Sequence, residues 1–225
     1  MGMVDKFDLK LNQLGLLHAV QDLRALERLH TWYPGQRAEL DFTKYGVFLY
    51  PNANWNYPVL YQDGMGVDHA STVVGSFLTS ASPSAADVVR LYRRFVMPKG
   101  SWLPPSLRQT AQRWDVFGVP MLVALDNGAD FMSNVSLLMY MLTGTILLRV
   151  PPRRGDLKGL VERTQGTFET RFISGLKGYV PRKYVGLNPR YTKQRERAMA
   201  AANMTVAEYE AKLVQNIRKR AVNPC

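Results

Sequence analysis

Hydrophobic and polar positions along the first half of the chain alternate between helical and strand-like spacing. Leucine and valine recur mostly at helical spacing over residues 5–30, which predicts a helix. Further along, Ser82 is a capping residue and Pro83 suits the first helical position, so we expect a second helix to run to about residue 96. Between these helices, short apolar runs predict three strands over residues 37–44, 58–68 and 71–79.

The second half of the chain alternates strands with helices. Residues 97–118 are rich in Pro, Trp and Arg, which predicts a loop with a short helix at 105–114. The elements expected after it are a strand over 117–126, a helix over 133–142, a strand over 145–150 and a helix over 157–172. Three consecutive strands favour an antiparallel meander, whereas strand–helix–strand order favours parallel crossovers. The pattern therefore predicts an α/β protein with a mixed five-stranded sheet and helices on both faces.

Positive charge is concentrated toward the C-terminus. Residues 1–150 carry 13 Lys and Arg against 12 Asp and Glu, whereas residues 151–225 carry 16 against 6. This asymmetry favours nucleic acid as a partner over an acidic membrane surface or a tail that only aids solubility. The basic segment after the last predicted helix contains Gly, Pro and Tyr, which is typical of an extended arm. Thr205 and Glu208 form a capping box, which predicts a terminal helix over about 206–220.

Several classes of protein are excluded by residue types. Cys225 is the single cysteine, so the chain has no intrachain disulfide and no cysteine-based zinc site. His18, His30 and His69 are scattered without metal-ligand spacing. The first residues lack the apolar region of a secretory signal, and no apolar run approaches the ~20 residues of a membrane span. We therefore expect a protein of the reducing cytoplasm without a membrane partner.

Three carboxylates are the candidates for chemistry. Asp41 lies in the first strand, Asp126 ends the apolar fourth strand, and Glu162 lies on the helix after the fifth strand. If the first and fourth strands are neighbours, Asp126 lies near Asp41, and Glu162 at the border of its helix's apolar face can point toward the sheet. Three such charges would repel without a cation, and their oxygens suit Mg²⁺. Two ions about 4 Å apart would activate a water or a 3′-hydroxyl and stabilise the leaving oxygen of a phosphodiester.

Each of these acids has an ordinary structural alternative. Asp126 begins an Asp-Asn-Gly sequence that is common in turns. Asp41 can be an exposed residue of a half-buried strand, and Glu162 can pair with the lysine one helical turn earlier. Asp68 on the second strand is a competing carboxylate, and we expect Asp63 in a loop or at the surface.

Four segments carry the most distinctive motifs of the chain: PGQRAELDFTKYGVFLYP (34–51), GVDHASTVVGSFLTSASPSAADVV (66–89), MLVALDNGADFMS (121–133) and PPRRGDLKGLVERTQGTFETRF (151–172). They resemble the retroviral integrase and transposase superfamily with its D,D,E triad, and especially Mu-like transposases of the TnsB type. The 35 residues between Asp126 and Glu162 match the spacing of retroviral integrases. The PPRRGD-x-KG-x-VE pattern is the most specific part, and the resemblance covers roughly residues 34–176. It implies a ribonuclease-H-like catalytic core.

The resemblance also implies roles for individual residues. Asp41 and Asp126 would bridge the metal, Glu162 would complete the shell of a second ion, and the two ions would be Mg²⁺, with Mn²⁺ as a substitute. The implied reaction is nicking at the 3′ ends of a mobile element, followed by direct transesterification into target DNA. Implied partners are transposon-end and target DNA, further copies of the chain on DNA, and accessory transposition proteins. The residues expected to contact DNA are Lys158, Arg153, Arg154 and Arg163.

The resemblance divides the chain into a helical lead-in (1–33), the catalytic core (34–176) and a basic arm with a C-terminal helix (177–225). Longer relatives carry N-terminal helix-turn-helix domains and a C-terminal β-barrel, so we expect a core fragment from a bacterial or phage-type mobile element. The second-strand motif departs from the family, since Asp68 is followed by His-Ala-Ser-Thr and the usual arginine is missing. The alternatives are an inactive or domesticated DNA-binding module of the same fold and a ribonuclease-H-like nuclease.

Overall fold

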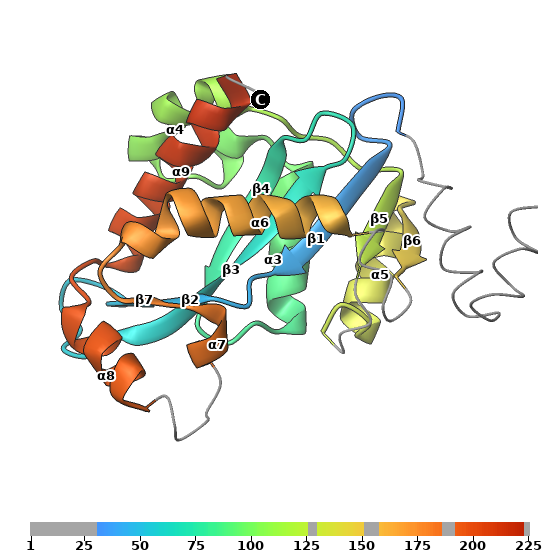
Figure 1. The fold of residues 1–225 in the computed structure, drawn as a ribbon. Helices are drawn as coiled ribbons and strands as arrows, with labels where there is room; N and C mark the ends of the chain where they lie inside the picture. Colours follow the sequence, from blue (N-terminus) through green and yellow to red (C-terminus); the bar gives the residue numbers. More distant parts are fainter. Residues whose placement is uncertain (1–30, 126–129, 151–157, 186–191, 223–225) are drawn as a thin grey trace, which may run out of the picture.

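The computed structural model of the protein describes residues 31–125, 130–150, 158–185 and 192–222. Figure 1 shows these residues as a central sheet with helices packed against it. The helix predicted over residues 5–30 lies outside the described residues. Within the described part of the chain, no helix is long and apolar enough to cross a membrane.

Seven strands form the sheet in the described ranges. They are β1 (Arg37–Phe42), β2 (Gly46–Leu49), β3 (Val59–Asp68), β4 (Val74–Ser80), β5 (Leu122–Leu125), β6 (Ile146–Arg149) and β7 (Tyr179–Val180). The α-helices of these ranges are α3 (Ala85–Val96), α4 (Pro105–Ala111), α5 (Asn134–Thr143), α6 (Gly159–Arg171), α7 (Arg182–Val185), α8 (Thr192–Ala201) and α9 (Val206–Val222). Short 3-10 segments are η1 (Lys99–Ser101), η2 (Gln112–Trp114) and η4 (Ile173–Gly175).

The sheet is mixed, as the sequence predicts. The order of its strands is β6-β5-β1-β3-β2-β7, and β4 also pairs with β3. The start of β3 pairs with β2, and its remainder, from Gln62 onward, pairs with β4 and β1. β1 runs antiparallel to β3 and parallel to β5, and β5 runs parallel to β6. The first and fourth of the predicted strands, β1 and β5, are therefore neighbours, an arrangement that the sequence left possible.

The predicted count of five strands is too low. The two further strands are β2 and β7, which pair with each other antiparallel. β2 begins only four residues after β1 ends, so the two merge into one apolar run in the sequence pattern. β7 has two residues, too few for any periodicity to appear.

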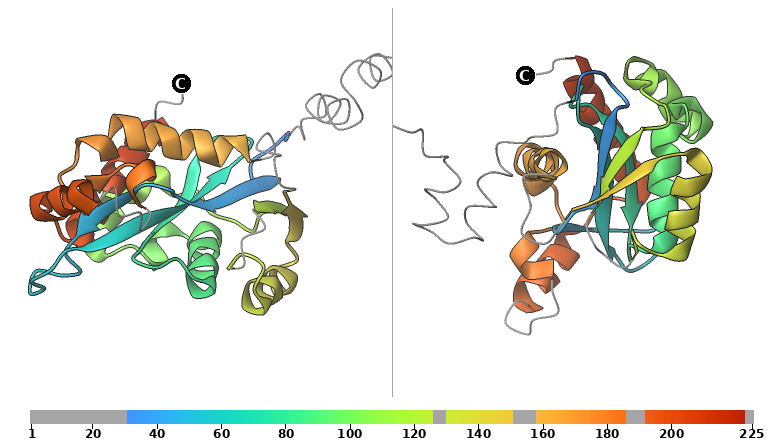
Figure 2. Two further views of the ribbon diagram at one scale, coloured as in Figure 1. Left: turned by 60° about the horizontal axis from the view of Figure 1, so that its bottom comes forward. Right: turned by 90° about the vertical axis from the view of Figure 1, so that its right-hand side faces the viewer.

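The two faces of the sheet carry different helices. The right panel of Figure 2 shows α3 and α5 on one side and α6 on the other. Successive side chains of β1 point to opposite faces of the sheet. Ala38 and Leu40 belong to the core beneath α3 and α5. Glu39 and Asp41 contact the start of α6 on the other face. The core on the α3 side contains Ala38, Leu40, Leu78, Val88, Leu91, Tyr92, Phe95, Val123, Leu125, Phe131 and Tyr140.

The terminal helix α9 belongs to the core on the α6 side. Its predicted capping box is present, since the Thr205 amide donates to Glu208 Oε2 at 2.8 Å and the Glu208 amide donates to Thr205 Oγ1 at 3.3 Å. The segment expected to be an extended arm instead contains β7, α7 and α8. A domain division at residue 176 stays a prediction, although α9 packs with the elements before it. The core residues shared between α9 and earlier elements include Tyr45, Met65, Trp114, Val161, Phe168, Tyr209, Leu213, Val214 and Ile217.

Asp63 is buried beneath α9, so its predicted place in a loop or at the surface is wrong. It lies in β3 and is 2% exposed. The Tyr209 hydroxyl donates to Asp63 Oδ2, and the Thr79 hydroxyl donates to Asp63 Oδ1 at 3.1 Å. Burial raises the pKa of Asp63 to about 7, against the lowering effect of these two hydrogen bonds. The sequence gives no sign of this burial because Tyr209 lies 146 residues further along the chain.

Replacing Asp63 with asparagine is expected to make the stability of the protein less dependent on pH. In the folded state Asp63 keeps its proton up to about pH 7, whereas in the unfolded chain it ionises near its usual pKa of 3.8. Between these values unfolding releases a proton, so the wild-type free energy of unfolding falls as pH rises from about 4 to about 7. The free energy of unfolding is measured by urea denaturation at about pH 5 and about pH 8. Its difference between the two pH values should be smaller for the variant than for the wild type. Equal differences in the two proteins would contradict this role of Asp63.

Candidate active site

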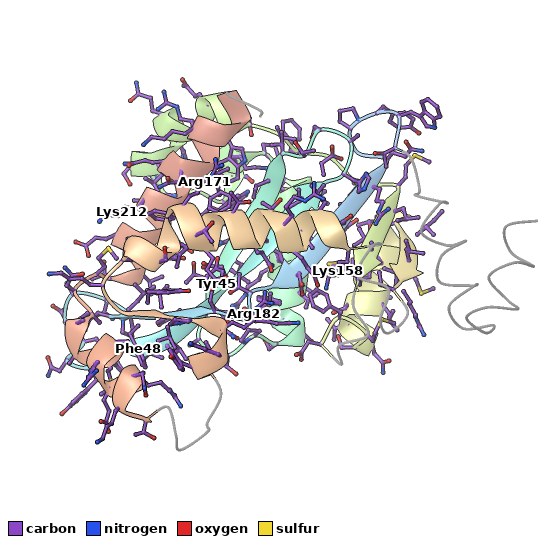
Figure 3. All side chains as sticks on the ribbon, in the orientation of Figure 1. Tyr45, Phe48, Lys158, Arg171, Arg182 and Lys212 are labelled. Carbon is purple, nitrogen blue, oxygen red and sulfur yellow. The ribbon has the colours of Figure 1, made fainter. Side chains whose placement is uncertain are left out.

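Asp41 lies where α6 begins its path over β1, and a lysine holds its carboxylate. Lys158 Nζ lies 2.9 Å from Asp41 Oδ1, and the amide of Phe42 donates to the same oxygen at 2.9 Å. The side chain of Lys158 is 5% exposed and that of Asp41 is 16% exposed. Figure 3 shows Lys158 at the start of α6, beside β1. Because water scarcely reaches the pair, each charge depends on the other for neutralisation, and removing one leaves the other poorly compensated.

The first turn of α6 is bound to β1 by further hydrogen bonds. Glu39 Oε2 accepts from the amides of Leu160 at 3.1 Å and Val161 at 3.0 Å. The side-chain amide of Gln165 donates to the carbonyl oxygen of Asp41 at 3.2 Å. Apolar packing holds the helix on the sheet, while these polar contacts determine where along β1 its first turn lies.

Glu162 lies in this first turn, and its side chain is exposed. At about 100° per residue, it lies about 60° around the helix from Gln165, which contacts β1. The structure does not show the predicted orientation of Glu162 toward the sheet. The alternative pairing of Glu162 with Lys158 is absent too, because Lys158 binds Asp41. The residues that α6 buries are Val161, Thr164, Gln165 and Phe168.

The remaining predicted site residues are described only in part. Arg163 lies on α6 with its side chain exposed. In the part of the chain that the structure describes, no group of three His, Cys, Asp or Glu side chains could hold a metal ion. The predicted residues outside the described ranges are Asp126, Arg153 and Arg154.

Asp68, the competing carboxylate, holds a turn. It is 2% exposed at the end of β3. Its Oδ1 accepts from the amide of Gly35 at 2.8 Å, and its Oδ2 accepts from both the amide and the hydroxyl of Ser71 at 2.8 and 2.6 Å. These bonds satisfy the carboxylate within the fold and connect the entry to β1 with the β3–β4 turn.

Glu39 is the residue of this region that the sequence reasoning missed. It is 1% exposed, and desolvation raises the pKa of its carboxyl, while the Val161 amide and the Arg37 guanidinium oppose that rise. The sequence does indicate on which face of β1 Glu39 lies. Residues two apart on a strand share a face, so Glu39 must lie on the same side of β1 as Asp41.

Exposed basic side chains continue along the side of the molecule that carries α6. Figure 3 labels Arg171 on α6, Arg182 on α7 and Lys212 on α9 in the view onto this helix. All three side chains are exposed. Such residues provide charge for phosphate groups without selecting a base sequence.

The chain belongs to the family of the TnsB C-terminal domain, whose model matches residues 39–178 and therefore more than half of the chain. The matched segment begins at Glu39 and includes the whole of α6, so it contains every contact between β1 and α6 given above. The match supports a general role in transposition. A comparison with curated protein sequences gave no match.

Two solved structures that match the chain come from T-cell lymphotropic viruses. A chain in the structure of a simian T-cell lymphotropic virus intasome in complex with PP2A regulatory subunit B56 gamma is 21% identical, with a TM-score of 0.43. The alignment covers 63% of this chain and only 41% of that one. The catalytic core domain of HTLV-2 integrase, in complex with magnesium, is 16% identical in its dimeric form, with a TM-score of 0.42 and coverages of 73% and 86%.

Proposed function

We propose that the chain is the catalytic core of a D,D,E transposase with a ribonuclease-H-like arrangement of strands. The observation that carries this proposal is the register between β1 and β5. These strands are parallel neighbours, and Glu39 pairs with Ala124. Asp41 follows Glu39 by two residues, and Asp126 follows Ala124 by two residues. Two parallel strands that run in step toward one edge of a sheet are a suitable support for a pair of carboxylates.

The third acid of the proposed triad is Glu162. The start of α6 is bound to β1 at Glu39 and Asp41, and Glu162 lies within this bound turn. In this proposal, a change of side-chain rotamer brings its exposed carboxylate toward the edge near Gln165. Such rotamer changes in exposed residues take place within nanoseconds.

The donor atoms fit a hard divalent cation. Asp41 already has a cation on Oδ1, since the ammonium group of Lys158 lies 2.9 Å away and stands in for positive charge at this oxygen. Carboxylate oxygens are the ligands that Mg²⁺ prefers. In this proposal Asp41, Asp126 and Glu162 would hold two Mg²⁺ ions, with Mn²⁺ as a substitute. When bound, the ions would supply Lewis acidity that activates the attacking oxygen and stabilises the leaving one.

The remaining chemistry is carried out by residues of the chain itself. Lys158 forms an ion pair with Asp41, and release from this carboxylate would make its ammonium available to a DNA phosphate. Arg153, Arg154 and Arg163 would contact neighbouring phosphates, which suits a reaction that must accept varied target sequences. The substrates would be transposon-end and target DNA, joined in the cytoplasm by several copies of the chain, with accessory transposition proteins choosing the target.

The proposed function is tested by a strand-transfer assay. The protein is incubated with a labelled, pre-cleaved DNA end, a target duplex and Mg²⁺ or Mn²⁺, and joined products are separated on a denaturing gel. Metal-dependent joining is the expected result. Cleavage without joining would favour a ribonuclease-H-like nuclease, and DNA binding without either reaction would favour an inactive module.

Replacing Lys158 with methionine is expected to strengthen Mn²⁺ binding in the absence of DNA by at least about tenfold. The ammonium group competes with the metal for Asp41, and unit charges 4 Å apart near a protein surface interact by about 4 kcal/mol. Isothermal titration calorimetry measures the change, and Lys212→Met, at an exposed lysine on α9, is the matched control. Unchanged or weaker Mn²⁺ affinity in Lys158→Met would show that the lysine does not compete.

A further inference from the structure

Glu39 is a buried carboxylate with partners on three elements. Its Oε2 accepts from the amides of Leu160 and Val161 in α6. Its Oε1 accepts from Arg37 Nη2 at 3.0 Å, and His69 Nε2 lies 3.8 Å from the same oxygen. With 1% exposure, the carboxylate depends on these groups to compensate for the water it has lost.

Helix α6 depends on this carboxylate at its start. The first amides of a helix have no partner within the helix and are usually capped by a nearby side chain. The residue at the N-cap of α6 is Lys158, which forms no capping hydrogen bond with its side chain. Glu39 supplies the missing acceptor from a different element, and its negative charge lies at the positive end of the helix dipole.

The position of Glu39 joins this cap to the candidate site. Glu39 lies two residues before Asp41 on the same face of β1, so a single strand holds both the cap and the carboxylate that binds Lys158. Lys158 and Glu162 lie on either side of the two capped amides. A shift at the start of α6 would therefore move both of them relative to Asp41, whereas the C-terminal part of the helix is held by its own apolar contacts.

We propose that Glu39 is a positioning residue that sets the first turn of α6, with Lys158 and Glu162, against Asp41. This inference rests on the proposed function, because it assigns Glu39 an effect on the rate of strand transfer. Glu39 acts through the helix, since it is 1% exposed and its oxygens accept from amides of α6 and from Arg37. Supporting groups of this kind affect activity by about 10- to 100-fold when they are removed.

The test compares Glu39→Gln with Asp68→Asn. Glutamine keeps the shape of Glu39 but has one acceptor oxygen, so its amide nitrogen must face either Arg37 or the α6 amides, which are all donors. Asp68 is a matched control, because it is equally buried and accepts two backbone amides but has no bond to α6. Both variants are assayed well below their melting temperatures, so that unfolding does not contribute.

Two measurements are made on each variant. The first is the rate of joining at saturating DNA, together with the DNA concentration for half-maximal rate. The second is hydrogen exchange in a peptide that covers residues 158–166. We expect Glu39→Gln to lower the maximal rate by about 10- to 100-fold, to leave the half-maximal DNA concentration within about twofold, and to speed exchange in this peptide. For Asp68→Asn, the maximal rate of joining and the rate of exchange in this peptide should each stay within about threefold of wild type.

The combination of readouts separates the possible results. Faster exchange without loss of joining would make Glu39 a structural cap alone and overturn the positioning role. Loss of joining without faster exchange would also overturn it, because Glu39 would then act by another route. Equal loss in Asp68→Asn would assign the effect to stability in general. If the wild type does not join DNA at all, the proposed function itself fails. Faster exchange in Glu39→Gln would then support only the role of Glu39 as a cap of α6.

Discussion

Replacing Glu162 with glutamine is expected to reduce DNA strand transfer by about a thousandfold or more. In the proposed mechanism the glutamate completes the shell of a metal ion, and such an ion contributes several kcal/mol of transition-state stabilisation. Each 1.36 kcal/mol corresponds to a factor of ten in rate. Because the side chain is exposed and forms no part of the buried face of α6, the variant should fold as the wild type does. Joined product is quantified from single-turnover time courses with Mg²⁺ and with Mn²⁺.

Glu196→Gln is the matched control for this experiment. Glu196 is an exposed glutamate on α8, and its replacement removes the same charge from a helix surface. Joining by the control should remain within about twofold of wild type, since surface substitutions away from special features are nearly neutral. Joining that survives in Glu162→Gln at the wild-type rate would remove the glutamate from the mechanism. A loss in both variants would point to overall charge instead.

Replacing Trp114 with alanine is expected to cost about 3–5 kcal/mol of folding free energy, the usual range for a buried aromatic residue. Trp114 is fully buried in η2, where its ring stacks on Phe77 with centroids 6.0 Å apart and meets the edge of Trp102 at 6.0 Å. Its Nε1 donates to the carbonyl oxygen of Val74 in β4. Alanine would leave a cavity between β4, η2 and α9 and an unpaired carbonyl group. Urea denaturation followed by far-ultraviolet circular dichroism measures the loss.

Trp55→Ala provides the comparison at a tryptophan that is 52% exposed in the loop between β2 and β3. Its cost should be below about 1 kcal/mol, because little packing is lost at an exposed site. If the two variants were equally stable, Trp114 would not be central to the core, and the packing of η2 against α9 would have to be revised.

The sheet could be predicted from the sequence where a strand has its own apolar run with clear ends. The order of the elements allowed β1 and β5 to be neighbours, and the capping box of Thr205 and Glu208 marked the start of α9 within one residue. The prediction failed where one run contained two strands. The short interval between Phe42 and Gly46 conceals the start of β2, because neither a proline nor a charged cluster separates it from β1. Lys44 is the sole charged residue there.

The candidate site was predicted less completely, because its contacts join residues far apart in sequence. The spacing of Asp126 and Glu162 pointed to a triad, yet nothing in the sequence showed that Lys158 binds Asp41 rather than a glutamate one turn away. The position of Glu39 on the Asp41 side of β1 follows from alternation, but its bonds to α6 need the helix position that only the fold provides. The burial of Asp63 could not be predicted either, because its partner Tyr209 lies 146 residues later and the residues around Asp63 do not indicate it.

The core on the α6 side has a consequence for protein synthesis. It joins Tyr45 to Ile217, which is made 172 residues later. A ribosome that adds about 5–20 residues per second needs roughly 10–30 s to pass from one to the other. Until α9 has been made, Trp114, Val161 and Phe168 lack their partners from it, so this part of the nascent chain exposes apolar surface. This core therefore cannot be completed until α9 has been made, however early the strands of the sheet have paired.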